Sequence, residues 1–309
     1  MSSKNNQMTD TREFDVIVVG GSYSGLSAAM SLGRSLKNIL IIDSGKPCNA
    51  QTPHSHNFIT QDGQTPKQIS TSAKEQLAKY KTIKFYNGLA KSGTRIEKGF
   101  EIKTQSNDIF FARKLIFATG LKDIMPDIKG FAECWGISII HCPYCHGYEV
   151  RNQKTALIGN GDMGFHFVQM ISNWTKELTL FTNEKSMLTE EQVGKIKKHN
   201  IEIVETEIDS FEHNNGKIEN IILKDNSKLS VNAIYARPQF VQHCDIPAEL
   251  GCELTEQGLI KVDMFQKTSV AGVFASGDNS NFGRALSAAV SSGSLAGAFS
   301  NNELIGEVF

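Results

Sequence analysis

The chain contains the order strand, glycine-rich turn and helix twice, and this pattern constrains the fold more than any other feature. Residues 14–20 (FDVIVVG) form an apolar, β-branched run that ends in glycine, and a segment with helical spacing follows over 26–36. Such short apolar runs predict buried strands. The order returns at 154–173, where KTALI precedes the turn GNGDMG and a second apolar helical segment. Two such units predict an α/β protein with two Rossmann-like domains.

The second turn contains the full G-x-G-x-x-G spacing at Gly159, Gly161 and Gly164, with Asp162 and Met163 between the last two glycines. In this spacing the first glycine makes the turn, the second lets the backbone approach a pyrophosphate, and the third lets the helix pack on the strand. The phosphates then lie against the amides of a helix N-terminus. In its strand–turn–helix context the motif predicts nucleotide binding.

The first turn, Gly20–Gly25 (GGSYSG), has Ser22 at the position of closest phosphate approach. Serine is small, so the departure weakens the motif without excluding a ligand. A second apolar run, 38–43 (NILIID), ends in Asp43, where an acid is expected to accept the ribose hydroxyls. We therefore expect a dinucleotide here too.

The second unit lacks the cationic cluster that a 2′-phosphate needs. Its second strand ends at 181–185 (FTNEK), which offers Lys185 beside Glu184 and no arginine. Glu184 is equally consistent with a ribose contact and with an exposed turn residue. We expect no strong selectivity for NADPH over NADH.

Composition sets the outer limits. The chain has 309 residues, a formal net charge of −1 and 40% hydrophobic residues, which suggests two ordinary domains and neither a nucleic-acid nor a membrane-surface partner. The polar N-terminus and the lack of a long apolar run predict a cytoplasmic protein without a membrane span. In that compartment a close cysteine pair is redox-active or metal-binding rather than structural.

Cys142 and Cys145 form that pair, in the stretch HCPYCHGYEV. C-x-x-C-H is used for haem attachment, but that chemistry needs an export compartment. Zinc needs two further ligands, and no second C-x-x-C or H-x-x-H exists. A thioredoxin module needs its own fold, yet this pair shortly precedes the second glycine turn. The favoured interpretation is a dithiol that works beside a flavin, and we expect no metal site.

Five motifs in this order resemble the low-molecular-weight thioredoxin reductases and their flavin-dependent relatives, over nearly the whole chain. They are Gly20–Gly25 with Asp43, Ala118-Thr119-Gly120, Cys142–Cys145, Gly159–Gly164, and 272–278 (GVFASGD) followed by Arg284 and a small-residue helix.

The resemblance implies two three-layer β/β/α domains, the second inserted into the first. The FAD-binding domain would cover 10–121 plus 247–309, and the NAD(P)-binding domain with the cysteine pair would cover 122–246. It also implies FAD, either NADPH or NADH, and a homodimer.

The same resemblance implies roles for individual residues. Cys145 would face the flavin and Cys142 would attack the substrate disulfide. The helix that starts near Arg284 and Ala285 would direct its positive end at the flavin, and Asp278 would hold the ribityl–pyrophosphate part. The residues expected at FAD are Gly20, Ser22, Tyr23, Ser24, Gly25, Asp43, Asn57, Ala118, Thr119, Gly120, Gly277, Asp278, Arg284 and Ala285. The residues expected at the pyridine nucleotide are Gly159, Gly161, Asp162, Met163 and Gly164.

His146 occupies the position where thioredoxin reductases have an aspartate. A histidine can transfer protons near neutral pH or lower the pKa of a neighbouring thiol, although an exposed turn histidine fits the position as well. The pattern C-x-x-C-H-G-Y-E more closely resembles a subgroup that contains dithiol oxidases of the gliotoxin and holomycin type.

Two functions therefore stay open. In the first, electrons pass from NAD(P)H through FAD to Cys142–Cys145 and on to a thioredoxin-like or small-molecule disulfide. In the second, an oxygen-using flavin dithiol oxidase forms a disulfide in a small molecule without tight NADPH use. A non-enzymatic nucleotide sensor would not need the cysteine pair. The sequence names neither the substrate nor the direction of electron flow.

Overall fold

The computed structural model describes residues 12–309, which divide into two compact units. The first unit takes in the chain up to Cys48, Lys67–Lys122 and Val241–Phe309, and the second takes in Asn49–Pro66 and Asp123–Phe240. Along the sequence the second unit is thus an insertion in the first. The expected boundaries assigned residues 49–66 to the first domain, whereas in the structure this loop groups with the second unit.

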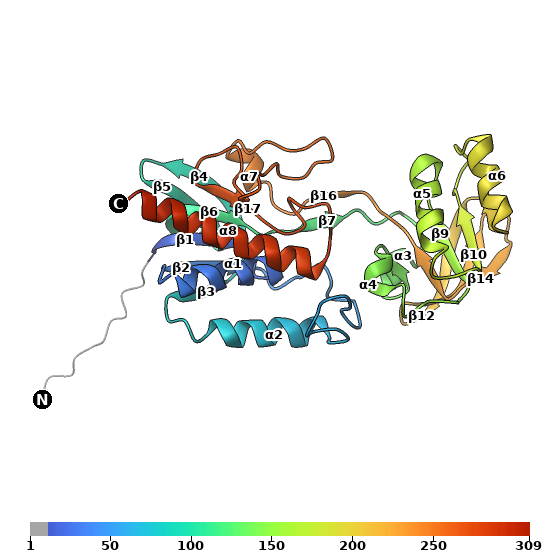
Figure 1. The fold of residues 1–309 in the computed structure, drawn as a ribbon, viewed down its shortest axis with the longest axis horizontal. Coiled ribbons are helices and arrows are strands. Elements are labelled where there is room, and N and C mark those ends of the chain that lie inside the picture. Colours follow the sequence, from blue (N-terminus) through green and yellow to red (C-terminus); the bar gives the residue numbers. More distant parts are fainter. Residues whose placement is uncertain (1–11) are drawn as a thin grey trace, which may run out of the picture. The chain divides into compact units, whose positions relative to one another are not determined.

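The first unit is built on a seven-stranded sheet of order β3-β2-β1-β6-β5-β4, with β17 also paired to β6 (Figure 1). Its strands are β1 (Glu13–Val19), β2 (Ile39–Asp43), β3 (Ile83–Asn87), β4 (Ala90–Ile96), β5 (Gly99–Thr104), β6 (Ile109–Phe117) and β17 (Val273–Ala275). Its helices are α1 (Tyr23–Arg34), α2 (Pro66–Leu77), α7 (Ile246–Glu249) and α8 (Leu286–Gly306). Strands β1, β2, β3, β6 and β17 run parallel, while β4 and β5 form an antiparallel extension.

Alternate residues of β1 enter two different cores. Ile17 and Val19 pack with Phe100 of β5, while Val16 and Val18 pack with helices α1 and α8. Since all four side chains are buried, the β-branched run is explained by a strand that is covered on both faces. This arrangement gives the three layers of the unit, with strands on one side of the parallel sheet and helices on the other.

Helices α1 and α8 lie side by side, which explains the small-residue composition of α8 (Figure 1). A Cβ on Gly293 would lie 2.1 Å from the carbonyl oxygen of Ser24, and one on Gly297 would lie 2.4 Å from that of Ala28. The Ser27 hydroxyl donates to the carbonyl of Val290 at 2.7 Å. The close contact therefore depends on glycines that larger residues cannot replace.

The second unit contains a five-stranded parallel sheet of order β11-β10-β9-β15-β8 and a three-stranded antiparallel sheet β12-β13-β14. Its strands are β8 (Ile139–Ile140), β9 (Thr155–Ile158), β10 (Leu178–Phe181), β11 (Glu202–Val204), β12 (Ile208–Asn214), β13 (Lys217–Leu223), β14 (Lys228–Ser230) and β15 (Ala233–Tyr235). Its helices are α3 (Phe131–Cys134), α4 (Pro143–His146), α5 (Gly161–Ile171) and α6 (Glu190–Lys198). The connecting strands β7 (Leu121–Asp123) and β16 (Phe240–Gln242) pair with each other.

No helix among the described residues is long and apolar enough to cross a lipid bilayer.

Candidate functional site

The first glycine turn links β1 to α1 and is closed against the end of β6. Gly20 has φ +105°, and a Cβ there would lie 2.2 Å from the carbonyl oxygen of Ala118. A Cβ on Gly25 would lie 1.9 Å from the carbonyl oxygen of Gly20. The first and third glycines are thus required by the turn itself and by helix packing.

Asp43 stands at the end of β2 beside this turn. A Cβ on Gly21 would lie 2.9 Å from the Asp43 Oδ2 atom, so the carboxylate is directly adjacent to the glycine backbone. Lys74 of α2 approaches the same oxygen at 3.8 Å. The structure therefore brings the acid to the position where the sequence predicts a ribose contact.

The C-terminal motif 272–278 joins the same place. The Ser24 hydroxyl donates to the Ser276 hydroxyl at 2.7 Å, and a Cβ on Gly277 would lie 3.0 Å from Ser24. The fully buried Asn279 donates from Nδ2 to the carbonyl of Phe117 at 2.8 Å and to the Thr119 hydroxyl at 3.2 Å. These bonds join the first glycine turn and the end of β6 to the C-terminal motif.

Arg284 and Asp278 lie next to each other, with Nε and Oδ2 3.6 Å apart. Helix α8 begins after Ala285, and none of the described side chains caps it. The N-terminus of α1, after Ser22, likewise has no side-chain cap within the described chain and no acidic residue in its first turn.

The first unit therefore fits FAD. Its glycine turn and two helix N-termini without a side-chain cap in the described chain could hold an anionic dinucleotide, and Asp43 could contact its ribose. Of the residues predicted for FAD, only Asn57 groups with the second unit.

In the second glycine turn, a side chain of the turn itself already bonds the backbone amide at the start of the helix. Asn160 caps α5, and its Oδ1 atom accepts from the backbone N–H of Gly161 at 2.9 Å and from that of Met187 at 2.8 Å. Its Nδ2 atom donates to the carbonyl of Lys185 at 3.0 Å. The loop after β10 is thereby fastened onto the turn.

Two carboxylates stand at the same turn. Asp162 lies in the first turn of α5 and accepts from Gln192 of α6 at 2.7 Å, while Glu184 Oε1 is 3.5 Å from Asn160 Nδ2. A helix N-terminus that already has a polar cap and neighbouring negative charges is a poorer site for a pyrophosphate than the uncapped turn of the first unit.

The cysteine pair lies on the single-turn helix α4, which Cys142 begins as its N-cap residue. Pro143 fixes the first helical position, and the backbone N–H of Cys145 donates to the Cys142 Sγ atom at 3.2 Å. Both cysteines are partly buried.

The electrostatic surroundings activate one thiol of the pair. The hydrogen bond from the Cys145 side chain, helped by backbone N–H groups and the charge of Arg237, lowers the pKa of Cys142 to about 7 against the opposing effect of burial. A thiol with this pKa is roughly half thiolate at neutral pH, and the thiolate is the nucleophile. Cys142 is therefore well suited to attack a disulfide.

His146 follows Cys145 directly and is partly buried. Burial lowers its pKa, the charge of His56 lowers it further, and Glu149 acts in the opposite direction. The ring is therefore neutral at neutral pH and can accept a proton.

The loop 49–66 packs against the segment that carries the cysteines. Gln51 donates from Nε2 to the carbonyls of Ala132 and Trp135 at 3.2 and 2.9 Å. His56 reaches Glu149 at 3.6 Å, and its ring centroid is 6.4 Å from that of His146. Sequence reasoning assigned Asn57 of this loop to FAD and missed that His56 lies near His146.

Other contributors also went unpredicted. Tyr235 is the buried last residue of β15, and Arg237 lies two residues beyond it. The charge of Arg237 lowers the pKa of Cys142, whereas burial and the charge of Cys142 raise the pKa of Tyr235. The sequence around β15 gives no signal that the end of this strand approaches the cysteines. Asn160 could have been found as a helix N-cap, since asparagine favours that position.

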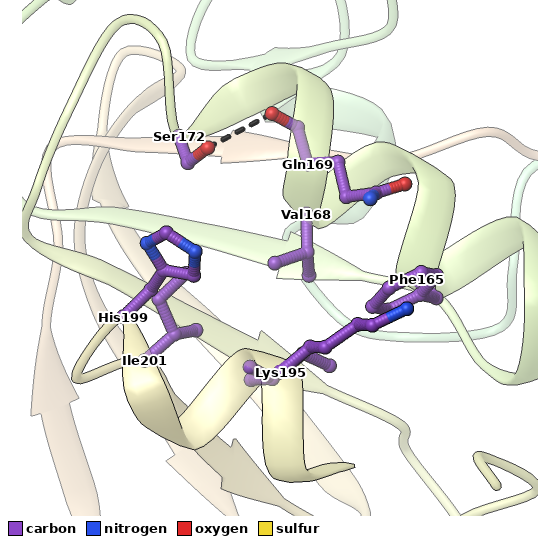
Figure 2. Close-up of a pocket in the computed structure, with 8 residues that line it drawn as sticks. Phe165, Val168, Gln169, Ser172, Lys195, His199 and Ile201 are labelled. Atoms are coloured by element: carbon purple, nitrogen blue, oxygen red, sulfur yellow. Dashed lines mark hydrogen bonds between the residues drawn. The ribbon is translucent and has the colours of Figure 1, made fainter. Parts of the chain in front are cut away.

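A shallow hollow between α5 and α6 is separate from these residues (Figure 2). It is lined by Phe165, Val168, Gln169, Ser172, Lys195, Ile196, His199 and Ile201. Ser172 donates to the carbonyl of Gln169 at 2.8 Å, and no predicted site residue lines the hollow. Among the described residues, no group of three histidine, cysteine or acidic side chains is arranged to hold a metal ion.

The sequence is similar to those of known disulfide oxidoreductases. The sequence model of the family described as pyridine nucleotide-disulphide oxidoreductase matches residues 14–293. Thioredoxin reductase sirT from Leptosphaeria maculans is 32% identical over 312 residues, which cover 95% of each chain.

Solved structures of related proteins have the same fold. The oxidoreductase from Agrobacterium tumefaciens superimposes with a TM-score of 0.89 at 32% identity, covering 95% of this chain and 99% of the other. The putative thioredoxin reductase TrxB from Bacillus anthracis gives a TM-score of 0.91 at 27% identity, covering 96% and 100%. These similarities confirm the predicted fold class and the resemblance to thioredoxin reductases.

Proposed function

Since the chain belongs to the pyridine nucleotide-disulphide oxidoreductase family and is thioredoxin reductase-like, we propose that its Cys142–Cys145 pair exchanges with an external disulfide or dithiol. Family membership implies FAD and a pyridine nucleotide without specifying which nucleotide. FAD, when bound, supplies the two-electron chemistry that a thiol pair cannot perform with a nucleotide.

The observation that carries the proposal is the asymmetry of the pair. Cys142 has a pKa of about 7 and accepts a hydrogen bond from the backbone of Cys145, whereas Cys145 lies inside the helical turn. A thiolate of low pKa is both an available nucleophile and a good leaving group. Cys142 is therefore assigned to the substrate and Cys145 to the flavin.

In the first candidate direction, NAD(P)H reduces the flavin and the pair reduces a thioredoxin-like or small-molecule disulfide. The retained glycines of the second turn support this direction. Cys142→Ser should leave flavin reduction by the nicotinamide intact and abolish disulfide reduction; unchanged turnover would refute the assignment of Cys142.

A second candidate direction is favoured by the closed second turn. Asn160 occupies the amides at the start of α5, and Asp162 and Glu184 add negative charge beside them. Tight binding of a pyridine nucleotide would require this cap to open. In this direction a small dithiol reduces the pair, the pair reduces the flavin, and oxygen reoxidises the flavin.

An anaerobic titration separates the two directions. The flavin absorption band at ~450 nm, a property of the cofactor, should bleach with NADH or NADPH if the chain is a reductase. Bleaching by dithiothreitol with neither nicotinamide effective would establish the oxidase direction. If no donor bleaches the flavin of the loaded protein, the proposed electron path is wrong.

A further inference from the structure

Four titratable side chains gather beside the cysteine pair, and the proposed function uses none of them. They form the histidine–carboxylate cluster, whose members are His56, Asp62, His146 and Glu149. All belong to the second unit, two from the loop 49–66 and two from the segment that begins with the cysteines. Imidazole and carboxylate groups are side chains that can accept and donate protons.

His56 stands at the centre of the cluster and has a carboxylate at each ring nitrogen. Its Nε2 atom is 3.6 Å from Glu149 Oε1, and its Nδ1 atom is 3.7 Å from Asp62 Oδ1. Its side chain is 20% exposed, whereas those of Glu149 and Asp62 are 40% and 67% exposed. An imidazolium at His56 would therefore have two anionic partners that lead outward to solvent.

The loop is folded so that this arrangement is kept. Asp62 also accepts from the backbone N–H of Asn57 at 2.8 Å, and the backbone of Ser55 pairs with Gln64 and Gly63 at 2.8 and 2.9 Å. Asn57 has φ +58°, a left-handed conformation that asparagine tolerates well. The residues on both sides of His56 are thus fixed by bonds within the loop.

The inner neighbour of His56 is His146. The two rings are perpendicular, with centroids 6.4 Å apart, so that an edge of one faces the other. Proton transfer across this gap takes one bridging water or a small rotation of either side chain. A neutral, partly buried His146 can accept a proton, and His56 can then carry it to the carboxylates.

We propose that His56 is a proton relay between His146 and the solvent-facing carboxylates of the cluster. The inference rests on the proposed function of the cysteine pair and adds the route by which its protons travel.

The reaction of the pair requires groups that remove and supply protons at the sulfur atoms. When a substrate dithiol reduces the Cys142–Cys145 disulfide, one substrate S–S bond forms and the enzyme S–S bond breaks. Two electrons pass to the enzyme, the substrate thiols release two protons, and the two cysteine thiolates bind two. The reverse reaction returns the same two protons from the cysteine thiols to the substrate. In either direction a proton must be removed from the attacking thiol and supplied to the leaving thiolate.

The test follows thiols rather than turnover. The oxidised, FAD-loaded protein is mixed anaerobically with dithiothreitol, quenched in acid and alkylated, and the peptide with both cysteines is weighed by mass spectrometry. His56→Ala should slow opening of the disulfide at pH 7 about tenfold or more, since positioned proton transfer contributes at least this much. Added imidazole should restore the rate, and the deficit should shrink at higher pH, where dithiothreitol ionises without help.

The matched control is His54→Ala. His54 is in the same loop and its ring is 6.4 Å from that of His56, but its Nδ1 atom contacts the carbonyl of Gly63 rather than a carboxylate. Its variant should exchange at the wild-type rate. Glu149→Gln should slow exchange at pH 7, without rescue by imidazole at wild-type His56.

Three results would overturn the relay: a normal rate in His56→Ala, an equal deficit in His54→Ala, or a deficit that imidazole leaves unchanged. Failure of the proposed function looks different, because the wild-type disulfide itself would then not react with dithiols while the loaded flavin is retained.

Discussion

Replacement of Cys145 by alanine tests the electrostatic origin of the reactive thiol. The hydrogen bond from Cys145 is the largest cause that lowers the pKa of Cys142 to about 7. Without it, burial acts against only the backbone N–H groups and Arg237, so the pKa should return toward its ordinary value of 9.0. A change of two units corresponds to about 2.7 kcal/mol of lost preference for the thiolate.

This change has a defined effect on reactivity. At pH 7 the thiolate fraction of Cys142 should fall from about one half to about 1%, roughly fiftyfold. The thiolate of higher pKa is intrinsically more nucleophilic by about six- to tenfold, so the net rate should fall only about five- to eightfold. At pH 10, where both forms are ionised, the variant should react several-fold faster than the wild type.

The assay is alkylation of the reduced proteins by iodoacetamide across pH 5–11, with Cys142 followed by peptide mass spectrometry. Cys145→Ser is the matched control, because its hydroxyl keeps a donor near the sulfur and should hold the midpoint below that of the alanine variant. The two rate curves of wild type and Cys145→Ala should cross near pH 8. An alanine variant with an unchanged midpoint near 7 would refute the reasoning and leave Arg237 and the backbone as the cause.

Three further predictions concern stability. Lys114 is buried and bonded to Glu303 and Glu307, so Lys114→Ala should lower the free energy of unfolding in urea titrations. The loss should be about 1–2 kcal/mol, because the two carboxylates keep Lys267 and Arg113 as partners. Burial raises the pKa values of both carboxyls, yet their bonds to lysine lower them overall, so this stabilisation should be present above pH 4.5 and decline as the pH falls below it. Gly293→Ala should prevent close packing of α8 and lower the thermal midpoint sharply, because its Cβ would lie 2.1 Å from a carbonyl oxygen of α1. Gly194→Ala, at a helical glycine with open space around it in the described structure, should instead stabilise the chain by about 0.5–1 kcal/mol.

The parts of the fold that were predictable are those encoded locally. Buried parallel strands appear as β-branched runs, and glycine turns mark where α1 and α5 begin. Both helices were nevertheless expected too late, from Leu26 and Phe165, whereas they begin at Tyr23 and Gly161. The first helical turn is built from the turn residues themselves, which carry no apolar periodicity.

Strand β4 was not predictable from its sequence, for a different reason. Its sequence AKSGTRI has little apolar alternation, and most of its side chains face solvent. It is a strand because it pairs with β5 at the end of the sheet, and such pairing is a tertiary effect. The neighbouring strands β11 and β12 likewise belong to two different sheets, as do β14 and β15, which periodicity along one segment does not reveal.

The candidate site shows the same limit. The cysteines, glycines and Asp43 are identified by spacing alone, and His146 by its place beside Cys145. The approach of His56 to Glu149 joins segments that are far apart in sequence, so no local pattern predicts it. The same holds for Arg237, which acts on Cys142 from the end of another strand.

The cysteine pair by itself does not determine the direction of electron flow. Thiol–disulfide exchange is reversible, and a thiolate of pKa near 7 serves equally as the attacking and the leaving group. The difference between a reductase and an oxidase must therefore come from the group that delivers electrons to the flavin. In this chain the residues that bear on this difference are Asn160 and its neighbours. The first glycine turn has no side-chain cap in the described structure, whereas the second is capped by Asn160 and lies beside two carboxylates. We therefore expect the two turns to differ in ligand capacity because of polar side chains at the variable positions of the second motif and in the loop after β10.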